Sequence, residues 1–163
     1  RVRLVVWDFD KTLLRIHTFG THVTVAQARE RPLAADFADL ATFQALVPAL
    51  LERGVAVAVA SFGEYEVIQT YLDRAVGRGV FTRDNISTPS VVGGKDGVTL
   101  RGGKNLQLQG LLSTMGADGE HGEPIRRHQV LFFDDSRRNI LWAKNEGYAF
   151  SFSCPRAFTR AEW

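Results

Sequence analysis

The stretch Trp7-Asp8-Phe9-Asp10-Lys11-Thr12 directly follows the apolar run Leu4-Val5-Val6. Short, continuous, β-branched apolar runs are typical of buried strands, so we predict a strand over residues 3–7. Side chains two residues apart in extended backbone point the same way, so we expect both carboxylates on one side of the strand end. Two such carboxylates repel each other and are tolerated best around a cation. From this stretch alone, an equally good interpretation is a pair of solvated loop acids.

Composition describes an ordinary globular chain. It has 163 residues, 45% of them apolar, and a net charge of +2. This length favours one domain over residues 1–163, and the charge is too small to indicate a nucleic-acid partner. No apolar run approaches the roughly 20 residues of a membrane span, so no membrane partner is expected. Cys154 is the single cysteine, which fits a reducing compartment and predicts a cytoplasmic location.

Apolar runs and helical periodicity alternate along the chain. Further strands are predicted at 55–60, 85–88, 130–133 and 148–152. Helices are predicted at 25–30, 36–50, 64–74, 106–112 and 137–146, with a kink at Pro48. A small β-hairpin is expected over 91–100, because Asp96-Gly97 favours a tight reversal. The alternation predicts an α/β fold, a doubly wound and mainly parallel sheet with helices on both faces.

Polar residues end three of the predicted strands. Asp8 and Asp10 follow the first, Ser61 the second, and Asp134-Asp135 the strand at 130–133. The carboxyl ends of parallel strands share one edge of a sheet, where ligands bind. We therefore expect these side chains, together with a lysine from a glycine-rich turn, to meet at one site.

This set of groups suits phosphoryl transfer. Mg²⁺ prefers oxygen ligands and commonly uses only a few carboxylates, with phosphate and water completing its shell. One carboxylate can attack phosphorus, and a second, protonated carboxyl can donate to the leaving oxygen. A hydroxyl, backbone N–H groups and a lysine can bind the phosphate oxygens. The sequence therefore predicts a phosphate-handling site with Mg²⁺ as its cofactor.

Four motifs resemble, in order, those of the haloacid dehalogenase-like (HAD) superfamily. They are Asp8-Phe9-Asp10-Lys11-Thr12-Leu13-Leu14, Ser61 after the strand at 55–60, Lys104 before a helix, and Asp134-Asp135 after Leu131-Phe132-Phe133. The stretch 132–140 looks most like the small magnesium-dependent phosphatases of that superfamily. The resemblance implies a HAD-like Rossmannoid fold and a Mg²⁺-dependent phosphatase that works through an aspartyl-phosphate. Asp10 favours a phosphatase, because the haloacid dehalogenases themselves have no carboxylate at that place.

The resemblance also implies roles for the residues of the first and third motifs. Asp8 would be the nucleophile and a metal ligand. Asp10 would be the general acid and base, and its backbone carbonyl would bind Mg²⁺. Thr12 would support the Asp10 loop on the substrate-binding side. Lys104 would pair with Asp8 and with the phosphate.

Roles for the second and fourth motifs follow from the same resemblance. Ser61 would hold the phosphate, together with the N–H groups of Phe62 and Gly63. Asp134 would ligate the metal, and Asp135 would do so directly or through water. An alternative for Asp135 is an acid that stabilises a helix N-terminus through the helix dipole.

Several assignments stay open at this stage. Lys95 is an alternative to Lys104, which we favour because it directly precedes a helical pattern. Arg137 and Arg138 lie close to the fourth motif, and a solvated helix start is the expected role for both. The histidines share no recognised metal spacing and are expected at the surface or behind the site: His17, His22, His121 and His128.

The space for a cap domain over the site is small. HAD enzymes carry caps after the first motif or between the second and third, but 13–36 and 77–103 are each too short to bury a core of their own. We therefore expect no cap or a minimal one. An open site suits phosphoprotein side chains or other bulky phosphoesters, while phosphotyrosine, phosphoserine, sugar phosphates and nucleotides all remain candidate substrates.

Two other function classes compete with a phosphatase. A phosphoacceptor signalling module would also be doubly wound, with an acidic pair, a hydroxyl residue and a lysine. Its acidic pair comes on the first strand and its phosphorylated aspartate on the third, nearly the reverse of the order here. A catalytically silent phospho-ligand-binding protein of the same fold would be expected to lack some of the acids, and all of them are present.

Overall fold

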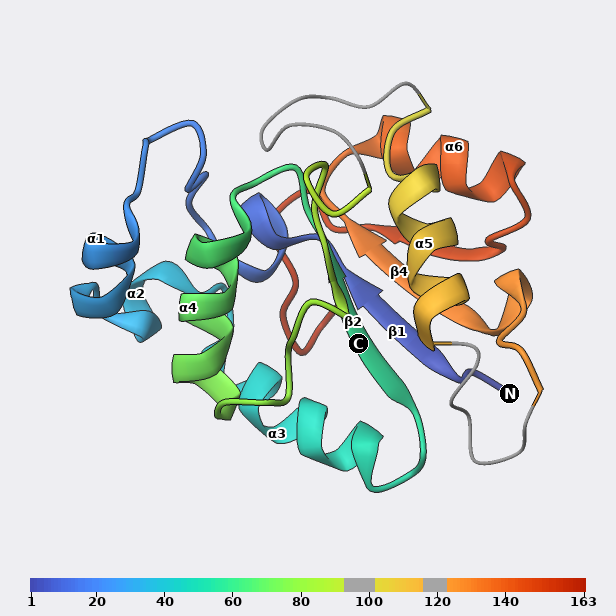
Figure 1. The fold of residues 1–163 in the computed structure, drawn as a ribbon, viewed down its shortest axis with the longest axis horizontal. Helices are drawn as coiled ribbons and strands as arrows, with labels where there is room; N and C mark the ends of the chain where they lie inside the picture. Colours follow the sequence, from blue (N-terminus) through green and yellow to red (C-terminus); the bar gives the residue numbers. More distant parts are fainter. Residues whose placement is uncertain (93–101, 116–122) are drawn as a thin grey trace.

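The computed structural model describes residues 1–92, 102–115 and 123–163, and a five-stranded sheet forms its centre (Figure 1). The strand order is β3-β2-β1-β4-β5, and every neighbouring pair is parallel. The strands are β1 (Leu4–Trp7), β2 (Ala56–Ala60), β3 (Ile86–Ser87), β4 (Val130–Asp134) and β5 (Phe150–Ser153). The doubly wound α/β fold predicted from the sequence is therefore confirmed.

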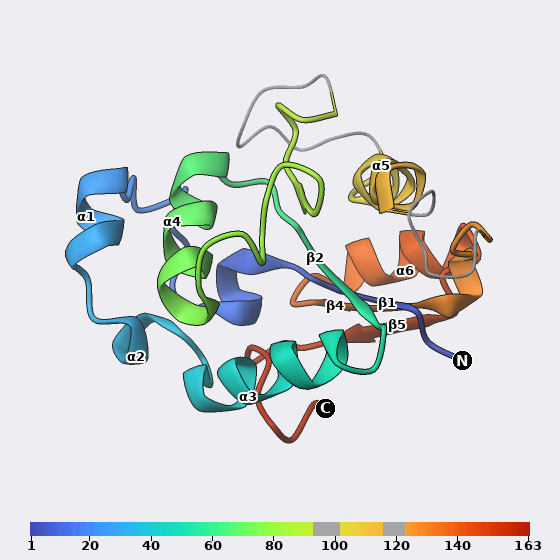
Figure 2. The same ribbon diagram turned by 60° about the horizontal axis from the view of Figure 1, so that its bottom comes forward.

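Helices cover both faces of the sheet (Figure 2). They are α1 (Val25–Glu30), α2 (Leu33–Asp36), α3 (Leu40–Leu51), α4 (Tyr65–Val76), α5 (Asn105–Met115) and α6 (Arg137–Asn145). The alternation of side chains along β1 divides the core into two layers. Val5 and Trp7 pack with the apolar residues of α3 and α4, whereas Leu4 and Val6 pack with those of α5 and α6.

The winding of the chain determines where a site can form. From β1 the chain builds outward through β2 to β3, and then returns to the other side of β1 through β4 to β5. The direction reverses between β1 and β4, and open parallel sheets bind ligands outside the strand ends at such a reversal. The polar residues that follow β1, β2 and β4 therefore meet at one edge of the sheet.

The prediction that a helix begins at Asp36 was wrong. The helix begins at Leu40, where the carboxylate of Asp39 caps it by accepting the N–H of Thr42 at 3.0 Å. Asp36 instead ends α2, and its buried carboxylate accepts from the Arg31 guanidinium and the Tyr71 hydroxyl. These tertiary partners leave no signal in local periodicity. The α3 helix also continues past Pro48, where the sequence predicted a kink.

The segment between β1 and α3 is a small excursion that lies against α4. An isolated bridge between Leu14 and Phe37 closes its base. Its two short helices pack on α4, where Arg74 donates to the carbonyl of Ala28 and Tyr71 donates to Asp36. The segment therefore shares the core of the sheet, and it forms no separate layer of its own.

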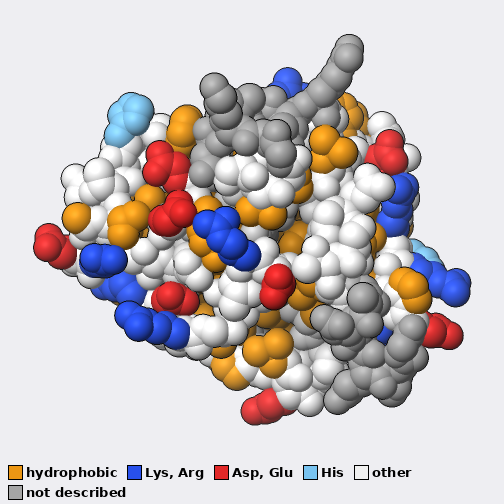
Figure 3. All heavy atoms as spheres, in the orientation of Figure 1, with side chains coloured by type: hydrophobic (Ala, Val, Ile, Leu, Met, Phe, Trp, Pro, Cys, Tyr) orange, Lys and Arg blue, Asp and Glu red, His pale blue; other side chains and the backbone are white. Residues whose placement is uncertain are grey.

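Three sequence predictions lie outside the described residues: the hairpin over 91–100, in its greater part, the role of Lys95 and the position of His121. The last strand begins two residues later than expected, at Phe150, and Tyr148 is buried just before it. None of the described helices is both long and apolar enough to cross a membrane. Figure 3 shows acidic and basic side chains intermixed over the α1–α4 side of this face.

Candidate functional site

The site begins where β1 ends at Trp7. The N–H of Asp8 still continues the sheet by donating to the carbonyl of Phe133 on β4 at 2.8 Å, so the position of Asp8 is fixed by the core. Asp8 as a residue is only 5% exposed. The buried hydroxyl of Thr12 donates to Asp8 Oδ2 at 2.8 Å and accepts the N–H of Asp135 at 3.0 Å. Thr12 therefore ties the first motif to the fourth from beneath the pocket and does not line the pocket wall, where a substrate-binding role would place it.

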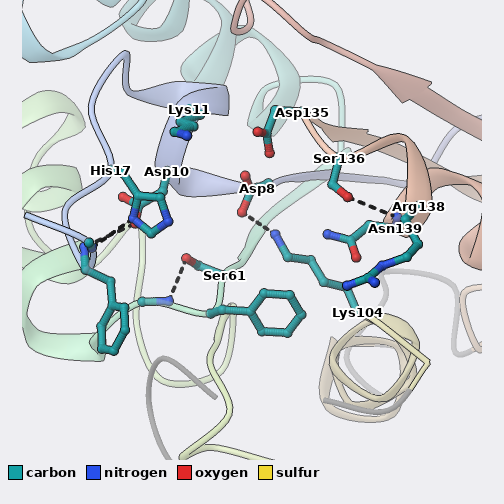
Figure 4. A pocket seen from close by; sticks show the side chains of 14 residues that line it. Asp8, Asp10, Lys11, His17, Ser61, Lys104, Asp135, Ser136, Arg138 and Asn139 are labelled. Carbon is teal, nitrogen blue, oxygen red and sulfur yellow. Dashed lines mark hydrogen bonds and ion pairs between the residues drawn. The ribbon is translucent and has the colours of Figure 1, made fainter. Parts of the chain in front are cut away.

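Asp10 does not extend beside Asp8 as an extended strand would place it. Residues 9–13 form a tight turn, in which the backbone of Asp10 is extended (φ −69°, ψ 129°) and Lys11 lies in the left-handed region at φ 60°. The carboxylate of Asp10 accepts from the N–H and hydroxyl of Thr18, at 2.9 and 2.7 Å, and from the N–H of Phe19 at 3.3 Å. It still lines the pocket, but with the 17–19 segment as its partner (Figure 4). Asp8 and Asp10 therefore both face one pocket, but Asp10 reaches it from a turn and has partners of its own, because the strand stops before Asp8.

Among the described residues, Lys104 is the lysine that contacts the acids of the site. It is 2% exposed, its ammonium contacts Asp8 Oδ1, and it lies 3.0 Å from Asp134 Oδ2. Gly103 makes this approach possible, since it adopts φ 63° and a Cβ there would lie 2.5 Å from the Trp142 ring and 2.7 Å from Asn139 Oδ1. The preference for Lys104 is supported by this placement.

Three carboxylates gather around this lysine. Oxygen atoms of Asp8, Asp134 and Asp135 lie within 4.8 Å of one another. Burial, together with Asp134 and Asp135, raises the pKa of Asp8 to about 8 against the opposing pull of Lys104. Burial and the neighbouring Asp134 also raise the pKa of Asp135. Burial disfavours the charged form of Lys104. The attraction of Asp134 and Asp8 is stronger than this effect and raises the pKa of Lys104, so the lysine stays protonated.

Asp134 is fully buried and is oriented by the start of α6. Ser136 caps this helix, and its N–H donates to Asp134 Oδ1 at 2.8 Å. The amide of Asn139 donates to both oxygens of Asp134, at 3.2 and 3.1 Å. Asn139 was not among the residues predicted for the site. Its position one helical turn after Asp135 could have indicated that its side chain lies near the acids of the site.

The end of β2 supplies the opposite wall. Ser61 is buried, and its Oγ accepts the N–H of Gly63 at 3.1 Å, so this N–H faces the serine in place of the expected phosphate. The amide of Gln107 donates to the carbonyls of Ser61 and Ser87, at 2.6 and 2.8 Å, and so fixes the ends of β2 and β3 against α5. Gln107 was missed because nothing in a helical pattern distinguishes a polar residue that faces inward.

These elements enclose a pocket of about 470 Å³. Most of the predicted site residues line it: Asp8, Asp10, Ser61, Phe62, Gly63, Lys104 and Asp135. Asp134 and Thr12 lie behind this lining. The pocket also contains side chains without an assigned role, among them Lys11, His17 and Arg138. The Nδ1 atom of His17 lies 3.1 Å from Asp10 Oδ2, and the residue is exposed, which agrees with the expected surface position beside the site.

Comparisons with known proteins add no relative. No model of a known protein family matches the chain, and no curated protein matches it at a significant level. The assignment of roles therefore depends on the geometry and on the motifs themselves.

The donor set fits a hard divalent cation. Asp8, Asp134 and Asp135 offer only carboxylate oxygens, and they come from the ends of two adjacent strands. The excess of buried negative charge, which holds the pKa of Asp8 far above its ordinary value, is the condition that a bound cation relieves. Magnesium suits such a set better than zinc, which prefers nitrogen and sulfur ligands.

Replacement of Gly103 tests the approach of Lys104 to the site. We expect Gly103→Ala to destabilise the protein by roughly 2 kcal/mol more than Gly102→Ala, because an added methyl group would overpack against Trp142 and Asn139. Gly102 is the matched control: it also has positive φ, at 82°, but a Cβ there meets nothing within 4 Å. Urea unfolding at a constant m-value measures the difference. Equal midpoints for the two variants would contradict the close packing.

The raised pKa of Asp8 predicts a pH-dependent stability without metal. Its pKa moves from 3.8 in the unfolded chain to about 8, so between these values the folded state binds more protons. The free energy of unfolding contributed by this group therefore falls as pH rises from about 4 to about 8. We expect denaturation in a chelator to show this fall, and Asp8→Asn to show a shallower one. Identical pH profiles for the two proteins would exclude Asp8 as the titrating group.

Proposed function

We propose that this protein is a Mg²⁺-dependent phosphomonoester hydrolase of the HAD type that works through an aspartyl-phosphate on Asp8. The observation that carries the proposal is the convergence of Asp8, Lys104 and the two acids after β4 at the reversal of the sheet. Structural ion pairs rarely gather three carboxylates, two of them buried, near one buried ammonium, because the desolvation is costly. A site that binds a cation and a phosphate accounts for this cost.

In the first step, an oxygen of Asp8 attacks the phosphorus atom. An Asp8–phosphorus bond forms while the bond from phosphorus to the ester oxygen breaks. Asp10 gives its proton to that oxygen, which leaves as the alcohol. Lys104 neutralises charge beside Asp8, and the hydroxyl of Ser61 donates to a phosphate oxygen. Thr12 keeps the attacking carboxylate oriented through its hydrogen bond to Oδ2.

In the second step, Asp10 takes a proton from water. The water oxygen bonds to phosphorus as the Asp8–phosphorus bond breaks, which releases inorganic phosphate and regenerates both acids. Asp8, Asp134 and Asp135 would hold the Mg²⁺ ion, with the Asp10 backbone carbonyl as a further ligand. When bound, the ion supplies positive charge that reduces repulsion between the carboxylate and the anionic phosphate.

The surroundings of the pocket favour bulky phosphoesters, including phosphorylated side chains of proteins. Between β1 and α3 the chain has only two short helices, of six and four residues, and both pack on α4. This part of the chain therefore supplies no cap domain that would select small substrates.

Release of phosphate from phenyl phosphate, p-nitrophenyl phosphate and a phosphotyrosine peptide tests the proposal. We expect turnover that requires Mg²⁺ and stops in a chelator. Absence of turnover with all of these substrates would contradict the proposed hydrolase. A stable phosphoenzyme without turnover would instead indicate a phosphoacceptor module.

A further inference from the structure

Arg138 stands on the wall of the pocket without an anionic partner. It is exposed and lines the cavity, on the opposite side from His17 (Figure 4). Its guanidinium lies 4.9 Å from the centroid of the Trp142 ring, and no ion pair or hydrogen bond joins it to any other residue that the structure describes. The charge is therefore available to a ligand.

The position of this charge is unfavourable for the helix itself. Arg137 and Arg138 are the first two residues of α6, where the helix dipole favours anions and disfavours cations. Trp142 lies one turn further along the same helix, and its ring gives the Arg138 guanidinium a flat surface to stack on. Trp142 thus positions the arginine at a point of the helix where a positive charge does not stabilise the helix.

Arg138 and Lys104 lie at different depths. Lys104 is buried between Asp8 and Asp134, where the transferring phosphate would meet it. Arg138 is exposed and contacts neither acid. A pocket of about 470 Å³ is large enough to hold a ligand that extends beyond its phosphoryl group. An anion at Arg138 would therefore belong to the rest of the substrate.

We propose that the substrate is a phosphomonoester whose leaving group carries a second anionic group, a carboxylate or a phosphate, bound by Arg138. This inference rests on the proposed hydrolase function. A guanidinium binds either anion through two parallel hydrogen bonds, which gives direction as well as charge. The ring of Phe62, which also lines the pocket and has its centroid 5.3 Å from the Lys104 ammonium, supplies apolar surface for the part of the leaving group between its two ends.

Matched aryl phosphates test this substrate class. The carboxyphenyl phosphates, substituted at position 3 or 4, are compared with the corresponding neutral carbamoylphenyl phosphates and with phenylene bisphosphates. We expect the protein to prefer an anionic substrate over its neutral match by roughly tenfold in kcat/KM, mainly through KM. Comparison of the carboxyphenyl phosphates with the phenylene bisphosphates shows whether a carboxylate or a phosphate is the preferred second anion. Equal kcat/KM for the charged and neutral compounds would overturn the proposal.

Two variants assign the preference to one side chain. Arg138→Gln should reduce the charged-to-neutral ratio to near one, whereas Arg137→Gln should keep it. Arg137 is the matched control because it carries the same charge at the adjacent position and does not line the pocket. Equal losses in the two variants would indicate general electrostatic attraction and overturn the assignment.

A binding measurement separates this inference from the hydrolase itself. Dissociation constants for carboxybenzyl- and carbamoylbenzylphosphonate, which cannot be hydrolysed, are measured by calorimetry in Mg²⁺. If no aryl phosphate is hydrolysed, the proposed function fails, yet a tenfold preference for the charged phosphonate that is lost in Arg138→Gln still supports the anion site. Equal affinities of the unaltered protein for both phosphonates would contradict that site.

Discussion

Asp8→Asn should lower kcat for phosphate release by roughly 10³-fold or more, because an amide cannot serve as the attacking carboxylate. The fold should survive. Asp8 is buried beside Asp134 and Asp135, and removal of one charge relieves the repulsion that raises its pKa to about 8. Steady-state assays in Mg²⁺ and a thermal unfolding curve measure the two effects together. Turnover that survives intact would exclude Asp8 as the nucleophile.

Substitution of the two carboxylates of the first motif, Asp8 and Asp10, should impair different steps of the reaction. With p-nitrophenyl phosphate the leaving group needs no proton, so Asp10→Asn should still form the phosphoenzyme but hydrolyse it slowly. Acid quenching should then trap a hydroxylamine-labile phosphoryl group in Asp10→Asn and none in Asp8→Asn. Asp84→Asn is the control, because this aspartate is away from the pocket of Asp8. Trapped phosphate in Asp8→Asn would place the nucleophile elsewhere.

Strand ends were the part of the site that the sequence could predict. Continuous apolar runs of the kind that forms β4 leave little ambiguity about a buried parallel strand, and the topology then brings their carboxyl ends together. This pattern was sufficient to predict that Asp134 and Ser61 lie at the ends of their strands. Lys104 was predictable because it precedes a helical pattern, but its burial depends on a glycine whose packing against Trp142 is a tertiary fact.

Residues 9–20 show what the sequence could not provide. The strand stops one residue before Asp8, and the turn that follows uses Lys11 at positive φ, which no propensity favours. The partners of Asp10 come from Thr18 and Phe19, in a stretch without period. The direction of a side chain after a strand depends on such turns, so a period of two cannot be extended beyond the strand.

Lys104→Met should destabilise the metal-free protein by about 3–5 kcal/mol at neutral pH. The lysine is 2% exposed and is the one cation in contact with both Asp8 and Asp134 among the described residues. Its loss leaves these buried carboxylates with their hydrogen bonds but without a cation. Protonation can relieve part of this cost, so the loss should be larger at pH 8 than at pH 5, in line with the raised pKa of Asp8.

Magnesium should restore much of the stability of Lys104→Met, because a cation bound to the same acids supplies the missing charge and stabilises the folded state by mass action. Lys144→Met is the matched control, since Lys144 is an exposed lysine in the last turn of α6 and its loss should cost under about 1 kcal/mol. Urea unfolding with and without Mg²⁺ measures both variants. If Lys104→Met unfolds no more readily than Lys144→Met at pH 8, the buried charges are not coupled as described. If Mg²⁺ stabilises the unaltered protein and leaves this variant unchanged, Lys104 contributes to the cation site itself, and the acids alone do not form it.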